Sequence, residues 1–453
     1  MTFFVKNVPY NFTELDDDDR DFSRNRKRAE ELGRECAQHW SIFEKVAVNL
    51  SRGETRESAA FGRAFLEATD RPAEAIEVAL RELERADVPN QSLLGGMLFA
   101  LFERDPLEVQ NILSRVSHSS KLREFLPYFT SLHLTPDGLS LVIDALDRGE
   151  LPPAAASIFG MGGVLKALPV LDVRRLITSL ISLGPDGAWV AVDLLSMYLH
   201  SDQSRLHEVS EEINSALRAA PIFMEKADLT MASYHYETLA KGLLSNTKYG
   251  PSFAAFLADQ VIKNAKETGS SDRGLPRKIA ELLLTLHPTS TLPVFASHIE
   301  QSDRTDRWFF SYILGTPFSF DGKHEGPLFK IGCEAIIAAC KSYPKNFAVM
   351  VAEVAPLFSA GDGPKKWTEI GKALLDKFGA RKDILHALTL NIGSGGWSGP
   401  TSSYLQTFIN PLEEIKDHPI RQVRSWARDR LKGLRHQIER ELRDEEEEAL
   451  RRS

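Results

Sequence analysis

The sequence predicts an all-α fold, and three observations support this class. Between Glu30 and Leu450, apolar residues recur at spacings of three and four, which is the period of a helix that buries one face. Sustained alternation of apolar and polar residues, the pattern of strands, is hard to find. Short connections carry proline, which fixes φ and disfavours helix in the preceding residue. About twenty helices fit between these boundaries.

The proline boundaries mark the predicted helices in order along the chain. They are Arg71-Pro72, Asp105-Pro106, Gly184-Pro185, Gly250-Pro251, His287-Pro288, Tyr343-Pro344 and His418-Pro419. The clearest helices are Ala73 to Ala86, Leu328 to Ser342 and Ile420 to Leu442. Their apolar stripes are Ile76, Leu80 and Leu83 in the first, Ile331, Ala335, Ala338 and Ala339 in the second, and Ile420, Val423, Ala427, Leu431, Leu434, Ile438 and Leu442 in the third.

Two segments of the chain have similar sequences. Leu134 to Leu146 can be laid over Leu183 to Leu195 without a gap, at an offset of 49 residues. Near its start each copy has proline followed by aspartate, which is favourable chemistry for a helix start. The offset suits a repeat of two or three helices, although helix-start preference alone would give the same match.

Stacked helical repeats bury each helix against its neighbours and leave an extended surface free for binding. In this pattern residues 30 to 450 resemble the HEAT-like α-solenoids. The resemblance implies an irregular α-solenoid of stacked antiparallel helical hairpins.

The predicted organisation has three parts. Residues 1–28 form a charged N-terminal lead-in, and residues 29–415 form the helical-repeat region. That region contains a non-helical loop insertion at 315–327 and a glycine-rich loop at 391–400. Residues 416–453 form a long amphipathic capping helix, from which Asp444 to Glu448 are expected to project into water.

Composition sets limits on the class of protein. Apolar residues make up 43% and charged residues 26%, as in soluble globular proteins. Neither a signal sequence nor a membrane-spanning run is recognisable, so we expect a cytoplasmic protein and no membrane partner. The net charge of -8, from 55 basic and 63 acidic residues, disfavours a wholly basic surface for nucleic acid.

The glycine-rich stretch Asn391 to Pro400 is the most distinctive local sequence. Its backbone N–H groups could cradle an anion at the start of the next helix. It lacks the lysine of a P-loop, and Ser398 is followed two positions later by proline rather than by the glycine of a nucleophile elbow. The alternative is a helix-ending loop with Trp397 packed beneath it.

The loop Phe320 to Pro327 carries a second set of candidate binding residues. His324 lies near Asp321 and Glu325 in the sequence. These residue types can bind a metal or move a proton, and the alternative is an ordinary surface loop without a site.

The last helix carries several arginines together with one tryptophan. They are Arg421, Arg424, Arg428, Arg435 and Trp426. A basic face with an aromatic residue could hold a phosphate backbone. Intrahelical ion pairing on a solvated face is the alternative.

We predict no catalytic residues, no cofactor and no metal site. Cys333 and Cys340 lie two helical turns apart, which suits core packing rather than shared metal ligation. In clusters such as Tyr234-His235-Tyr236, neighbouring residues point to different faces of a helix, so we assign these histidines no role.

The C-terminal end resembles a second group of proteins. Trp397 to Pro400, then Val423 to Asp429, then a charged helix ending in Glu445 to Glu448 look like the end of helical-repeat segments in large bacterial proteins, including antiviral STAND-type systems. This resemblance implies sensing or scaffolding and no catalysis. We therefore expect recognition of a protein partner, with nucleic acid as the alternative and an enzyme built from distant helices as the less favoured third reading.

Overall fold

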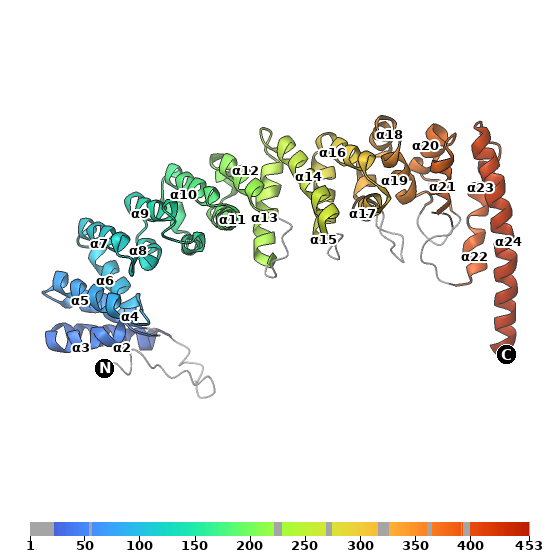
Figure 1. Cartoon of the computed structure of the whole chain (residues 1–453). Coiled ribbons are helices and arrows are strands. Elements are labelled where there is room, and N and C mark those ends of the chain that lie inside the picture. Colours follow the sequence, from blue (N-terminus) through green and yellow to red (C-terminus); the bar gives the residue numbers. More distant parts are fainter. Residues whose placement is uncertain are drawn as a thin grey trace. The chain divides into compact units, whose positions relative to one another are not determined.

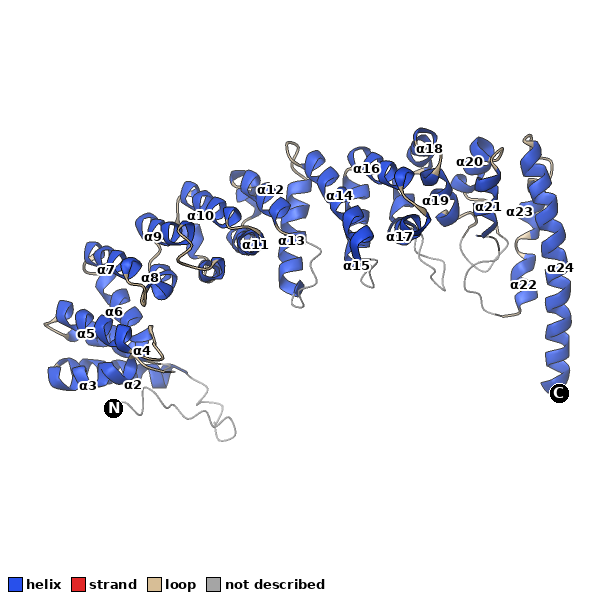
Figure 2. Ribbon diagram, in the orientation of Figure 1, coloured by secondary structure: helices blue, strands red, loops and turns tan. Residues whose placement is uncertain are grey.

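The computed structural model describes residues 22–53, 57–221, 229–268, 274–315, 326–359, 365–390, 392 and 399–452. Within these residues every regular element is a helix (Figures 1 and 2). Strand-like pairing in these residues is limited to two isolated bridges, Arg52 with Pro89 and Phe358 with Trp367. The predicted all-α class is confirmed, and the helices form a solenoid-like arrangement.

The chain divides into two compact units, residues 1–242 and residues 243–453. The helices of the first unit are α2 (Phe22–Ala37), α3 (Trp40–Leu50), α4 (Ser58–Ala68), α5 (Pro72–Arg85), α6 (Ser92–Phe102), α7 (Pro106–His118), η2 (Arg123–Phe125), α8 (Leu126–Leu132), α9 (Pro136–Asp147), η3 (Pro153–Gly160), η4 (Val164–Ala167), α10 (Val170–Ser182), α11 (Pro185–Leu199), η5 (Gln203–Glu208), α12 (Ser210–Ala219) and α13 (Leu229–Leu244). The division falls within α13.

The helices of the first unit form two rows, and within each row a helix packs on a helix of the next hairpin. In one row α2 packs on α4, α4 on α6, α8 on η3 and η3 on α11. In the other α3 packs on α5, α7 on α9, α9 on α10 and α10 on α12. Successive helix starts in this second row, Pro72, Pro106, Pro136 and Val170, lie 30 to 34 residues apart.

The similarity at an offset of 49 residues does not mark this repeat. The first copy forms α9, which packs on α7 and α10, and the second forms α11, which packs on η3 in the other row. The matching residues therefore open helices at non-equivalent positions. Shared helix-start chemistry explains the similarity, because Pro136 and Pro185 each occupy the first turn of their helices.

Glycines allow α2, α4 and α6 to approach closely. A methyl group on Gly33 would overlap the carbonyl oxygen of Phe61, and one on Gly96 would overlap that of Ala59. Phe43 and Phe65 stack beside this contact with ring centroids 4.0 Å apart. Both phenylalanine side chains are fully buried, so the core of the first hairpins lies between the two rows.

The second unit is also built of helical hairpins. Its helices are α14 (Gly250–Thr268), α15 (Gly274–Leu286), α16 (Pro288–Gln301), α17 (Arg304–Leu314), η6 (Pro327–Ile331), α18 (Cys333–Ser342), α19 (Asn346–Val354), α20 (Glu369–Phe378), α21 (Lys382–Leu390), α22 (Thr401–Gln406), α23 (Ile409–Glu414) and α24 (Arg421–Arg452). One row contains α14, α16, α18 and α20, and the other contains α15, α17, α19, α21 and α24.

The predicted proline boundaries are confirmed to within a few residues. α5, α7, α11 and α16 each begin at the predicted proline. The predicted helix Leu328 to Ser342 is corrected, because Gly332, with φ of 88°, separates η6 from α18. Its buried face is also different from the predicted stripe and consists of Ile336, Ile337 and Cys340.

α24 buries most of its predicted stripe. Val423, Ala427, Leu431, Leu434 and Ile438 are buried, whereas Leu442 is 39% exposed. Asp444 and residues 446–448 are exposed, as expected for this end of the helix, whereas Glu445 is half-buried. Its carboxylate accepts the backbone N–H of Ser402 at 3.0 Å and the hydroxyl at 2.6 Å, and these bonds hold the pKa of Glu445 below its usual range.

Among the described helices, none combines the length and the apolar character needed to cross a lipid bilayer.

Candidate recognition surfaces

α17 exposes an aromatic surface to solvent. Arg304, Trp308 and Tyr312 stand four residues apart and so share one helix face, which we call the aromatic face. Trp308 is 55% exposed and Tyr312 is 42% exposed. The opposite side of the helix buries Phe310 and Leu314, so the orientation of the aromatic face is fixed by packing.

Both ends of α17 are held by polar contacts. At the start, the carboxylate of Asp303 accepts the backbone N–H of Asp306 at 2.9 Å, which caps the helix. At the end, Arg277 of α15 donates to the carbonyl oxygens of Tyr312 and Gly315 at 3.0 and 2.9 Å. A cation at the C-terminal end of a helix is also favoured by the helix dipole. These contacts hold both ends of the helix that carries the aromatic face.

A half-buried carboxyl group lies next to α17. Glu353 of α19 is 3.5 Å from the guanidinium of Arg307. Burial raises the pKa of Glu353, while the positive charges of Arg307 and Arg304 oppose that rise, as does His386 of α21. The ion pair between Arg307 and Glu353 links α17 to α19.

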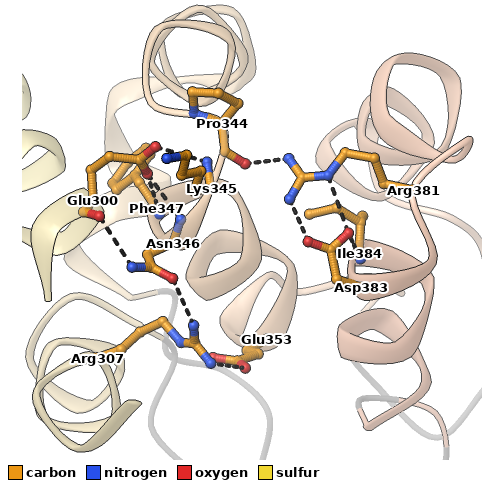
Figure 3. Close-up of polar contacts among 10 residues, drawn as sticks. All are labelled: Glu300, Arg307, Pro344, Lys345, Asn346, Phe347, Glu353, Arg381, Asp383 and Ile384. Atoms are coloured by element: carbon orange, nitrogen blue, oxygen red, sulfur yellow. Dashed lines mark hydrogen bonds and ion pairs between the residues drawn. The ribbon is translucent and has the colours of Figure 1, made fainter. Parts of the chain in front are cut away.

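A polar network joins these hairpins at their turns (Figure 3). The carboxylate of Glu300 accepts the backbone N–H groups of Lys345, Asn346 and Phe347 at 2.9, 2.9 and 3.1 Å. The side-chain amide of Asn346 donates to the carbonyl oxygen of Ser302 at 2.9 Å. Because it fills the N-terminal end of α19, Glu300 stabilises the junction between hairpins instead of offering a ligand site.

Two of the residues predicted on α24 make internal contacts. Arg424 donates to the carbonyl oxygens of His418 and Pro419 at 2.7 and 2.9 Å. The indole N–H of Trp426 donates to the hydroxyl of Thr389 at 2.8 Å. At about 100° per residue, Trp426 and Arg424 lie on opposite borders of the buried stripe. The structure therefore does not bring the indole among the arginines.

Arg421 and Arg428 are exposed. The guanidinium of Arg428 is 3.8 Å from the carboxylate of Asp417, and that of Arg435 is 2.5 Å from Glu413. An open depression lies between α23 and α24. Its lining residues are Glu413, Lys416, Arg428, Leu431, Lys432, Arg435, His436 and Glu439. Acidic groups interrupt its positive charge. The ion pairs of Arg428 and Arg435 reach residues outside α24 and are not the intrahelical pairs that the sequence suggested.

Three predicted residues lie outside the described part of the chain. They are Trp397 and Ser398 of the glycine-rich loop and His324 of the loop insertion, with its neighbours Asp321 and Glu325. Their predicted roles stay predictions.

A histidine and an aspartate meet between α11 and α13. His235 Nδ1 is 2.5 Å from Asp193 Oδ1, and the His235 side chain is 8% exposed. Sequence reasoning assigned His235 no role, and its partner lies 42 residues earlier in the chain, so no local signal could have found it. The pair links neighbouring helices of the first unit.

The thiols are poorly suited to nucleophilic chemistry. Burial raises the pKa of Cys36 to about 11 and that of Cys340 to about 12, and it also raises the pKa of Cys333. A thiol with a raised pKa is protonated at neutral pH and reacts slowly. In the described part of the chain, no group of three histidine, cysteine or carboxylate side chains is arranged to hold a metal ion.

Comparison with known proteins gives no relative: no family model, no curated protein and no solved structure matches this chain.

Sequence reasoning missed the aromatic face. The signal was present, since Arg304, Trp308 and Tyr312 recur every four residues, which is a helical spacing. The same spacing also describes a buried stripe, and only the packing of Phe310 and Ile313 against neighbouring helices shows which side faces solvent.

Proposed function

We propose that this chain is a recognition or scaffold module that binds a protein partner through its helical-repeat surface. The observation that carries the proposal is the aromatic face of α17. Tryptophan, tyrosine and arginine dominate the binding energy of protein interfaces, and here one of each stands on consecutive turns. The partner would offer an apolar pocket for Trp308 and an acidic group for Arg304.

Charge supports a protein partner over nucleic acid for the molecule as a whole. Residues 1–242 contain 26 Lys and Arg against 37 Asp and Glu, and residues 243–453 contain 29 against 26. Neither unit has the strong basic excess of a protein that wraps nucleic acid. A nucleic-acid-binding repeat protein with a basic groove is the alternative.

Finer parts of the proposal rest on sequence resemblance. We place the repeats with the HEAT-like solenoids and the chain in the cytoplasm. The resemblance of the last sixty or so residues to antiviral repeat segments supports a sensor role in a bacterial defence system. No catalytic activity is part of the proposal.

The test is affinity purification from the native host with quantitative mass spectrometry. The wild-type chain is compared with the double variant Trp308→Ala/Tyr312→Ala and with the control Leu107→Ala/Leu171→Ala. The control residues are apolar and 79% and 66% exposed, on α7 and α10. The proposal expects one protein to be enriched with wild type and control and lost with the double variant. Recovery of the same proteins with all three, or of no protein, would count against it.

A further inference from the structure

Two connections between helices lie side by side at one edge of the second unit. The turn between α18 and α19 contains Pro344, and the turn between α20 and α21 contains Arg381. Arg381 donates to the carbonyl oxygen of Pro344 (Figure 3). α18 also packs on α20, and α19 packs on α21, so the two hairpins align at this edge.

Four exposed lysines surround these turns. Lys341 lies in the last turn of α18 and Lys345 directly precedes α19. Lys377 lies in the last turn of α20 and Lys382 begins α21. We call these four residues the lysine edge. Among the described residues, none of the four ammonium groups is within ion-pairing distance of a carboxylate.

The acidic groups near these turns have other hydrogen-bond or ion-pair partners. Glu300 accepts three backbone N–H groups at the start of α19. Asp383 pairs with Arg381 at 2.5 Å, and Asp376 accepts from His418 at 2.9 Å. The lysine edge therefore presents four ammonium groups that no carboxylate of the described residues pairs with, although the whole chain is acidic.

The chemistry of this edge differs from that of a protein interface. Among the described residues of α18 to α21, the one large apolar side chain that is well exposed is Leu390, at the opposite end of α21. Protein interfaces are anchored by buried apolar and aromatic side chains. Interfaces with nucleic acid are more polar and much more positive, and lysine meets phosphate as a compact point charge.

We propose that the lysine edge binds the phosphate backbone of a nucleic acid without reading its base sequence. The edge offers point charges and no described aromatic side chain that is well exposed for base stacking. This inference goes beyond the proposed protein-binding function and does not depend on it.

The experiment measures binding of the full chain to a fluorescein-labelled oligonucleotide, single-stranded and duplex, by fluorescence anisotropy between about 50 and 200 mM salt. Four lysine–phosphate contacts predict a slope of log affinity against log salt of about -3 for a single strand. The variant Lys341→Gln/Lys345→Gln/Lys377→Gln/Lys382→Gln is expected to lose most of that slope, at about 0.7 for each lysine, and at least about tenfold in affinity at low salt.

The matched control removes the same charge elsewhere. Lys27→Gln/Lys45→Gln/Lys366→Gln/Lys432→Gln replaces four exposed lysines on other segments, namely α2, α3, the connection between α19 and α20, and α24. Circular dichroism and thermal unfolding confirm that each variant is folded. Wild-type-like binding by the control supports the proposal. It is overturned if the wild type does not bind, if the control loses as much as the edge variant, or if labelled poly-glutamate binds the edge while oligonucleotides do not.

Discussion

The carboxylate of Glu300 accepts the backbone N–H of Asn346 at 2.9 Å, while the side-chain amide of Asn346 donates to the backbone oxygen of Glu300 at 3.1 Å. This reciprocal pair joins the end of α16 to the start of α19. The pair resembles a capping box, in which a side chain accepts the N–H groups that have no partner at a helix start. Here the accepting side chain, Glu300, comes from a different hairpin.

Glu300→Ala should destabilise the second unit by about 1–2 kcal/mol, because three backbone N–H groups lose their acceptor. Urea unfolding followed by circular dichroism measures the change. Glu35→Ala is the control, since Glu35 is exposed on α2, and its effect should stay within about 0.5 kcal/mol. An equal loss in both variants would show that the Glu300 contacts contribute no stability.

Gly96→Ala should destabilise the first unit by about 1–3 kcal/mol, because the new methyl group would overlap the carbonyl oxygen of Ala59 and push α4 from α6. Gly433→Ala is the matched change. Gly433 lies within α24 with nothing within 4 Å of the added carbon, so helix propensity should raise stability by about 0.5–1 kcal/mol. Thermal unfolding should therefore shift in opposite directions for the two variants. A Gly96→Ala protein as stable as wild type would refute the close approach.

Glu353 predicts a specific pH dependence of stability. Burial raises the pKa of Glu353 in the folded protein above its ordinary value of 4.5. As the pH rises above that value, the unfolded chain releases this proton before the folded protein does, so unfolding becomes more favourable. Glu353→Gln cannot titrate. The free energy of unfolding of the variant should therefore increase relative to that of wild type as the pH rises from about 4 towards neutrality. A constant difference across urea titrations in this range would contradict the assignment.

Local features of this fold were predictable from the sequence. Helix starts at Pro72, Pro106 and Pro185 follow from the geometry of proline alone. The buried stripe of α24 from Val423 to Ile438 follows from helical spacing. Both signals lie within a few residues of the feature that they predict.

Features that depend on distant partners were not predictable. Glu300 contacts residues 45 to 47 positions later, and Glu445 contacts Ser402 at a separation of 43. The stripe chosen for α18 was wrong because alanines at helical spacing occur on exposed and buried faces alike, and the packing of Ile336 and Ile337 decides between them. For the same reason the aromatic face of α17 became visible only in the structure.

The most direct test of the central proposal is the affinity of the purified partner for the Trp308→Ala chain, measured by isothermal titration calorimetry. If Trp308 anchors the interface, Trp308→Ala should weaken the binding free energy by at least about 2 kcal/mol, which raises Kd roughly 30-fold, while Leu107→Ala leaves Kd unchanged. An unchanged Kd for Trp308→Ala would show that the partner binds elsewhere and would contradict recognition through α17.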